Sequence, residues 1–155
     1  MTYRTASQVL ERLAARGWTI GTAESLTGGL LAAALVSVPG ASASMRGGVV
    51  AYASDVKNSV LKVDADLLAS AGAVDPAVAW QMAQGVRTLL GTDVGVSTTG
   101  VAGPDPQDGK PVGTVHIAVV TPDGTGITSL EIPGSREQIR SETVQRALAL
   151  CLEEV

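Results

Sequence analysis

The chain has few of the residues on which several common kinds of functional site depend. Its 155 residues include no phenylalanine, one cysteine and one histidine, and aromatic side chains make up only 3%. A single cysteine excludes a disulfide within the chain and a cysteine-rich zinc site. One histidine cannot build a histidine-based zinc site. A hydrolytic centre here would therefore use a lysine, tyrosine or carboxylate as its base, unless His116 itself served.

Charge and hydropathy exclude two further classes of protein. The chain has 11 basic and 15 acidic residues, a formal net charge of −4, so neither a basic surface nor aromatic stacking platforms for nucleic acid are expected. No apolar run approaches the roughly 20 residues that a membrane-spanning helix requires. The amino-terminal pattern is polar and amphipathic, unlike a signal peptide. We therefore expect a cytoplasmic protein without a metal or cofactor that binds neither nucleic acid nor membranes.

Hydrophobic periodicity predicts alternating helices and strands. We expect helices at residues 3–16, 27–38, 64–71, 76–90 and 135–154, a short helix capped by Ser54, and strands at 18–23, 47–53, 94–100, 111–120 and 126–132. Asp64 and Asp75 are the expected amino-terminal caps of two of these helices. The order predicts an α/β fold, a mixed five-stranded sheet with helices on both faces. Without repeats or linkers, residues 1–155 are expected to form a single domain.

The stretch from Gly21 to Gly29 is the most informative part of the sequence. It joins a short apolar strand to an Ala/Leu-rich helix and contains Glu24, Ser25 and Thr27. Strand-to-helix turns place side chains at the edge of an α/β sheet where ligands usually bind. Ser25 is therefore a candidate nucleophile. The alternative at this point is that Ser25 or Thr27 merely caps the following helix.

Tyr52 and Lys57 lie five residues apart across the next strand-to-helix turn. A serine hydroxyl needs a neighbouring base, and a lysine can be that base if burial lowers its pKa toward neutrality. A nearby tyrosine could hold or relay the proton. Taken alone, however, an Asp-Val-Lys turn is more often a solvated surface.

Two further clusters could bind a substrate. Backbone amides at or after Thr99 and Gly100 could stabilise an oxyanion, although this segment could equally be a plain loop. Arg136 and Arg140 share one face at the start of the last predicted helix, where they could hold a phosphate or simply face solvent.

Five motifs, read together, resemble one protein family. In chain order they are Thr22-Ala23-Glu24-Ser25-Leu26-Thr27-Gly28-Gly29, then Gly47-Gly48-Val49-Val50-Ala51-Tyr52 with Lys57, then Gly72-Ala73-Val74, Thr99-Gly100-Val101-Ala102-Gly103-Pro104 and Lys110-Pro111-Val112-Gly113-Thr114-Val115. They resemble the CinA C-terminal domain family, whose enzymatic members hydrolyse nicotinamide mononucleotide to nicotinate mononucleotide and ammonia. The resemblance implies a three-layer α/β/α sandwich, a small-molecule nucleotide substrate and a homo-oligomer.

The resemblance also implies roles for individual residues. Ser25 matches the nucleophile, Lys57 the base and Tyr52 the assisting tyrosine. The matching substrate-binding positions are Thr27, Gly28, Gly29, Thr99, Gly100 and Arg140, with Arg140 near the phosphate. With Ser25 as the nucleophile, Thr27 becomes the expected helix cap.

One departure from the family pattern keeps other functions open. Asp75 stands where the family commonly has a serine, and a carboxylate that touched the substrate would disfavour an anionic ligand. If Asp75 only caps a helix, nothing changes. A non-catalytic nucleotide-binding protein and an amidase for a different amide are therefore the alternative functions.

Overall fold

Five strands form one mixed sheet in the computed structural model, which describes residues 2–155. They are β1 (Ile20–Glu24), β2 (Met45–Val50), β3 (Val94–Gly100), β4 (Thr114–Val120) and β5 (Thr125–Glu131), arranged in the order β2-β1-β3-β4-β5. β1 is parallel to both β2 and β3, whereas β4 and β5 are each antiparallel to the strand before them. Every residue of β1 and β4 is buried, as expected for strands covered on both faces.

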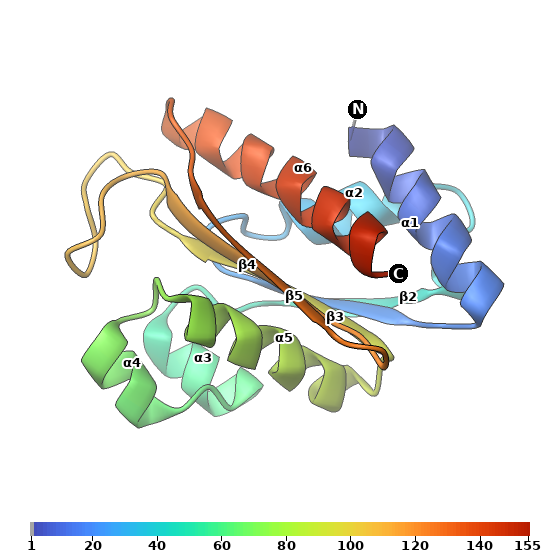
Figure 1. The fold of residues 1–155 in the computed structure, drawn as a ribbon, viewed down its shortest axis with the longest axis horizontal. Helices are drawn as coiled ribbons and strands as arrows, with labels where there is room; N and C mark the ends of the chain where they lie inside the picture. The colour runs from blue at the N-terminus through green and yellow to red at the C-terminus, as the bar shows by residue number, and fades with distance from the viewer. Residues whose placement is uncertain (1) are drawn as a thin grey trace.

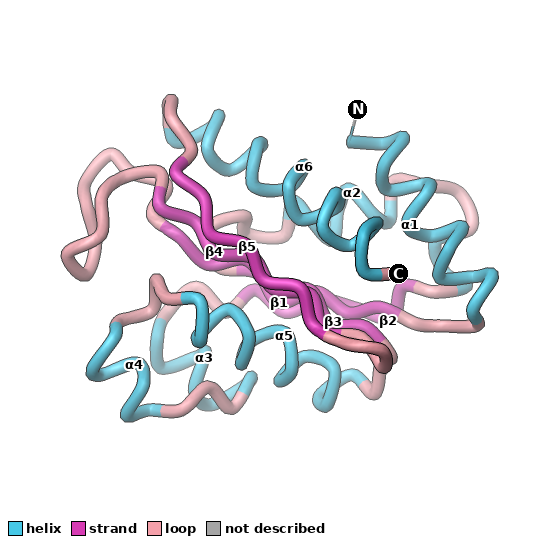
Figure 2. Tube along the Cα trace, viewed as in Figure 1, coloured by secondary structure: helices cyan, strands magenta, loops and turns pink. Residues whose placement is uncertain are grey.

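Helices cover both faces of this sheet (Figure 1). On one face lie α1 (Thr2–Arg16), α2 (Leu30–Val36) and α6 (Arg136–Glu154), and on the other lie α3 (Ser54–Leu61), α4 (Ala65–Ala71) and α5 (Pro76–Leu90), as Figure 2 also shows. The fold class predicted from the sequence, a three-layer α/β/α sandwich with a mixed five-stranded sheet, is confirmed.

The buried apolar side chains form a separate core on each side of the sheet. The larger core includes Leu13, Leu31 and Leu148 from the three helices of the first face, packed against strand residues such as Ile117. On the opposite face, Met82 belongs to a smaller cluster with residues of α3 and α5. Helices therefore pack through apolar side chains against both faces of the sheet, and this packing fixes the positions of the strand ends.

The sheet contains a topological switch point beside β1. From β1 the chain moves to β2 on one side, and from β2 it returns to β3 on the other side of β1. The connections that leave the carboxyl ends of β1 and β3 therefore run in opposite directions. In open α/β sheets, ligands bind in the crevice at such a point.

Several helix ends test the local predictions. Asp64 accepts hydrogen bonds from two amides of α4, and Asp75 accepts one from Ala77 of α5, so both predicted caps are confirmed. The predicted Ser54 cap is wrong, because Ser54 is the first residue of α3 and Ala53 takes the cap position without a side-chain hydrogen bond. Within residues 2–155, no helix is long and apolar enough to cross a membrane.

Candidate active site

Lys57 is the most unusual buried side chain of the protein. It lies on α3 with only 1% of its surface exposed. Its Nζ lies 2.9 Å from Ser25 Oγ, 2.9 Å from the carbonyl oxygen of Ala51 and 3.0 Å from that of Tyr52. The two residues predicted as nucleophile and base are thus in direct hydrogen-bond contact, although 32 positions separate them in the sequence.

Burial also changes the protonation of this amine. It lowers the pKa of Lys57 from 10.5 to about 8, while the negative charge of Asp108 acts in the opposite direction. At pH 7 such an amine is neutral in about one molecule in ten. The ammonium donates to Ser25 Oγ and to the two carbonyls, whereas the neutral amine has two hydrogens for the carbonyls and one lone pair that can accept from the Ser25 hydroxyl. The surroundings of Lys57 therefore suit a general base for Ser25.

Ser25 occupies a tight turn at the carboxyl end of β1. Its backbone amide donates to Thr98 O (3.0 Å), and its carbonyl accepts from the amide of Gly28 (3.1 Å). Gly28 has a φ of +58°, a conformation that glycine adopts without the steric cost of a side chain. The turn holds Ser25 at the strand end, with 8% of its surface exposed.

Glu24 stabilises this turn, a role that the sequence did not reveal. Its carboxylate accepts hydrogen bonds from Thr27 Oγ1 (2.6 Å) and from the backbone amides of Gly29 (3.2 Å), Leu31 (2.8 Å) and Ala32 (3.0 Å). Only 1% of Glu24 is exposed. These hydrogen bonds satisfy the buried oxygens of the carboxylate. Glu24 thus connects β1 to the start of α2.

The predicted cap by Thr27 is consequently wrong. Gly29, and not Thr27, occupies the cap position of α2. The carboxylate of Glu24 accepts the hydrogen bonds from the first amides of the helix that a capping side chain would otherwise accept. The hydroxyl of Thr27 forms hydrogen bonds with Glu24 and with Thr98 Oγ1 (2.8 Å). It therefore ties the turn to β3.

A small cavity of about 120 Å³ opens beside Ser25. Four predicted site residues line this cavity, and they come from the ends of β1 and β3 and from the segment after β2. They are Ser25, Tyr52, Thr99 and Gly100. Thr99 Oγ1 donates to the carbonyl of Ala73 (2.7 Å), so this hydroxyl holds the cavity wall. At Gly100, an added Cβ would lie 2.6 Å from Thr114 O, so the strand pairing requires a glycine there.

Tyr52 reaches this cavity differently from the prediction. Its backbone carbonyl, and not its hydroxyl, accepts the hydrogen bond from Lys57. Its side chain is 62% exposed, and its hydroxyl accepts from Arg136 Nη2 (3.2 Å), while Arg136 Nη1 donates to Gly103 O (2.6 Å). Arg136 therefore bridges two segments at the rim of the cavity. Assistance by the Tyr52 hydroxyl in proton transfer stays a prediction.

Arg136 and Arg140 lie in different environments. Arg136 lines the cavity. Arg140, the residue that the family resemblance assigns to the phosphate, is not among the lining residues. Its Nε donates to Leu26 O (2.8 Å), and its Nη2 lies 3.5 Å from Thr27 O. Sequence spacing put both arginines on one face of α6, but it did not show that they reach different targets.

Two aspartates near the cavity have structural contacts. Asp75, the departure from the family pattern, caps α5 through Ala77 N (2.8 Å) and does not line the cavity. Asp108, on the loop between β3 and β4, accepts from Ala73 N (3.2 Å) and raises the pKa of Lys57 against the effect of burial. An Asp-Gly pair in a loop predicts a turn, but nothing in the sequence indicates this contact.

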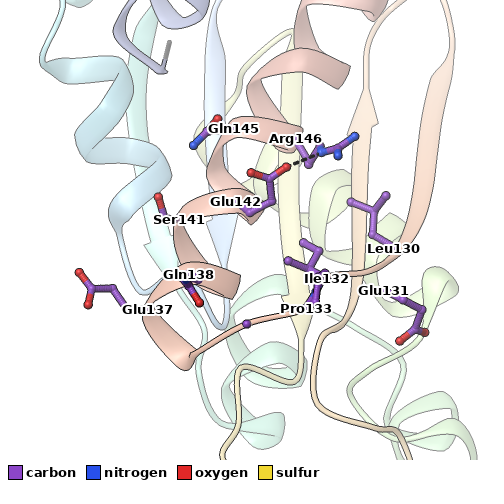
Figure 3. Close-up of a pocket in the computed structure, with 11 residues that line it drawn as sticks. Leu130, Glu131, Ile132, Pro133, Glu137, Gln138, Ser141, Glu142, Gln145 and Arg146 are labelled. Carbon is purple, nitrogen blue, oxygen red and sulfur yellow. Dashed lines mark hydrogen bonds and ion pairs between the residues drawn. The ribbon is translucent and has the colours of Figure 1, made fainter.

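Two other features of the described chain differ from this serine–lysine arrangement. A cavity of about 770 Å³ lies between the segment after β5 and α6, where Glu142 and Arg146 form an ion pair of 2.7 Å (Figure 3). Ser141 and carboxylates line it, but no lysine is among the lining residues. His116 pairs through Nδ1 with Ser129 Oγ (2.8 Å) and does not contact Ser25. Residues 2–155 hold no group of three or more histidine, cysteine, aspartate or glutamate side chains positioned for a metal.

Comparison with known proteins agrees with the predicted resemblance. The sequence model of the family described as CinA C-terminal domain matches residues 2–155. A "CinA-like protein" of Frankia casuarinae is 55% identical over 142 residues, covering 92% of this chain and 33% of that protein. A "putative competence-damage inducible protein" of Geobacillus sp. is 49% identical, covering 88% of this chain and 33% of that protein. The chain thus spans about a third of the length of these relatives.

Solved structures match over nearly the whole chain. Competence damage-inducible protein A from Klebsiella pneumoniae has a TM-score of 0.95 at 37% identity, covering 99% of this chain and 96% of that one. A competence/damage inducible protein from Agrobacterium tumefaciens has a TM-score of 0.94 at 34% identity, covering 98% of this chain and 94% of that one. The chain therefore belongs to the CinA C-terminal domain family.

Proposed function

We propose that the protein is an amidohydrolase that converts nicotinamide mononucleotide to nicotinate mononucleotide and ammonia. The observation that carries the proposal is the 2.9 Å contact between Ser25 Oγ and the buried amine of Lys57. A buried lysine without a carboxylate partner destabilises a protein, and Lys57 has two carbonyls and a hydroxyl instead. A base for Ser25 gives this arrangement a chemical purpose.

In the first half of the reaction, Ser25 attacks the carboxamide. Its Oγ forms a bond to the carbonyl carbon while its proton passes to the neutral amine of Lys57. The carbonyl oxygen then carries a negative charge in the tetrahedral intermediate, where backbone amides stabilise it. As the intermediate collapses, the C–N bond breaks, and Lys57 returns the proton to the departing nitrogen. Ammonia leaves, and an ester between Ser25 and the nicotinate group remains.

In the second half, water hydrolyses this ester. Lys57 accepts a proton from water, whose oxygen attacks the ester carbon, and the C–Oγ bond then breaks. The proton returns from Lys57 to Ser25 Oγ, and the carboxylic acid that forms loses its remaining proton, which ammonia takes up, so that the product leaves as a carboxylate. One base therefore serves both steps, and the sum is amide plus water giving carboxylate and ammonium.

The cavity and its rim suggest how the substrate binds. A volume of about 120 Å³ suits the carboxamide-bearing ring rather than a whole mononucleotide. The ribose and phosphate would then extend toward the rim, where the contacts of Arg136 within residues 2–155 are with neutral acceptors, the hydroxyl of Tyr52 and the carbonyl of Gly103. Its charge is available for a phosphate, so we assign phosphate binding to Arg136. Binding by Arg140, implied by the family resemblance, is the alternative.

Release of ammonia from nicotinamide mononucleotide by the purified protein tests the proposal. We expect turnover with the mononucleotide, weaker binding of nicotinamide riboside, which lacks the phosphate, and stoichiometric formation of nicotinate mononucleotide. A thermal-shift titration with the mononucleotide belongs beside this assay. Stabilisation without ammonia release would favour the non-catalytic nucleotide-binding protein, and turnover only with other amides would favour a different amidase.

A further inference from the structure

The turn after β1 contains two backbone amides without a hydrogen-bond partner among the described residues. The amide of Ser25 donates to Thr98, and the amide of Gly28 closes the turn on the carbonyl of Ser25. Between them, the amides of Leu26 and Thr27 have no hydrogen-bond partner within residues 2–155. Both residues are buried, with 4% and 0% of their surface exposed. Because buried backbone donors rarely remain unpaired, these two amides are suited to receive an oxygen atom from a ligand.

Their position relative to the nucleophile indicates which oxygen this would be. Leu26 directly follows Ser25 and lines the same cavity. In other serine hydrolases, the amide of the residue after the nucleophile often binds the oxyanion, because the oxyanion forms on the carbon that the serine attacks. The first amides of α2 cannot serve, since the carboxylate of Glu24 already accepts from them.

Arg140 binds the other side of one of these two peptide groups, the one that joins Leu26 to Thr27. Its Nε donates to the carbonyl of Leu26 (2.8 Å), and this carbonyl shares its peptide group with the amide of Thr27. In a trans peptide the C=O and N–H bonds point in opposite directions. A guanidinium held on Leu26 O therefore fixes the direction of the Thr27 N–H on the opposite side. It also polarises the peptide group, which strengthens the N–H as a donor.

Two details support this use of Arg140. It forms no ion pair within the described part of the chain, so its full charge acts on the carbonyls of Leu26 and Thr27. At Gly28, an added Cβ would lie 3.4 Å from Arg140 Nη2, so the glycine leaves room for the guanidinium against the turn.

We propose that the amides of Leu26 and Thr27 form the oxyanion hole and that Arg140 is the positioning residue that holds and polarises the amide of Thr27. The inference rests on the proposed hydrolytic function. Arg140 thus acts on catalysis through the turn, not through the phosphate. Its removal should lower the rate of the chemical step and leave substrate affinity nearly unchanged.

Steady-state kinetics of Arg140→Met, with Arg136→Met as the matched control on the same helix, test the inference. For Arg140→Met we expect kcat to fall about tenfold or more, KM to change less than about threefold, and the same kcat loss for nicotinamide riboside. Arg140→Lys, which keeps a cation near Leu26 O, should recover part of the loss. For Arg136→Met, we expect KM to rise for the mononucleotide only. An Arg140→Met variant with unchanged kcat and a higher KM for the mononucleotide alone would overturn the inference.

A second measurement separates this inference from the identity of the substrate. A fluorophosphonate reacts with Ser25 by forming an Oγ–P bond; the P–F bond breaks, fluoride leaves, and the serine proton passes to Lys57. The phosphoryl oxygen of the reagent then occupies the oxyanion hole. We expect labelling about tenfold slower in Arg140→Met, with an unchanged circular dichroism spectrum. Slower labelling without any hydrolysis of the mononucleotide would support the inference and reject the proposed substrate. Labelling at the wild-type rate, or no labelling of wild-type Ser25, would overturn the inference.

Discussion

Substituting Lys57 by methionine should remove a pH-dependent part of the free energy of unfolding. In the folded protein, burial lowers the pKa of Lys57 from 10.5 to about 8, whereas in the unfolded chain the amine returns to water. Between these two values the unfolded state binds more protons than the folded state, so the free energy of unfolding rises with pH. Below about pH 8 both states hold the proton, and the full cost of burying the charge is present.

The size of the effect follows from the pKa difference. The pKa of Lys57 is 10.5 in the unfolded chain and about 8 in the folded protein, a difference of about 2.5. Each pKa unit corresponds to about 1.36 kcal/mol, so the free energy of unfolding should rise by about 3 kcal/mol between pH 7 and pH 11. The pKa of about 8 already includes the opposing effect of the negative charge of Asp108.

Urea unfolding of the wild type and of Lys57→Met, at several values from pH 7 to pH 10.5, measures this effect. Other titrating groups cancel in the difference between the two proteins. We expect the wild type to gain about 2–3 kcal/mol relative to the variant as the pH rises through this window. Lys62 is an exposed lysine directly after the same helix, so Lys62→Met is the matched control. For this variant, the difference in free energy of unfolding from the wild type should stay constant with pH. A constant difference for Lys57→Met as well would refute the claim that its amine is desolvated.

Three further predictions follow from other contacts. The kcat for ammonia release should rise with pH and level off above about pH 8, and Asp108→Asn should shift this rise to lower pH, because Asp108 raises the pKa of Lys57; an unchanged profile would contradict the coupling. Glu24→Gln should lower the free energy of unfolding by about 1–3 kcal/mol, since an amide nitrogen at the Oε2 position would face the backbone amide of Ala32; a loss below about 0.5 kcal/mol in urea unfolding would contradict this role. Gly48→Ala should cost about 1–3 kcal/mol in the same assay, because the added Cβ would collide with Thr22 Oγ1, and a neutral substitution would argue against this close packing.

The parts of the fold that the sequence predicted are those governed by local pattern. Residues 94–100 form a strand with the predicted ends, and Asp75-Pro76 starts α5 as expected. Alternating apolar segments and cap residues act within a few positions of the chain, so their signals are readable directly. The predicted strand at 111–120 begins only at Thr114, because strand ends depend on pairing with other strands rather than on local sequence.

The parts of the site that the sequence did not reveal depend on contacts between distant segments. The motif resemblance brought Ser25 and Lys57 together correctly, whereas their spacing alone would not have done so. In the sequence, Glu24 is indistinguishable from any other polar residue of a turn. Its role as acceptor for the first amides of α2 depends on the folded turn, which brings the carboxylate next to the start of that helix. Similarly, Arg136 and Arg140 have the same chemistry on one helix face, and only the paths of the neighbouring loops distinguish them.

The most direct test of the central claim is the kcat of Ser25→Ala for ammonia release from nicotinamide mononucleotide. The exposed Ser54→Ala on α3 is the matched control. If Ser25 is the nucleophile and Lys57 its base, kcat should fall by about a thousandfold or more in Ser25→Ala, with an unchanged melting profile, and should stay within twofold of wild type in Ser54→Ala. A folded Ser25→Ala protein that retains more than a tenth of the wild-type kcat would contradict the account.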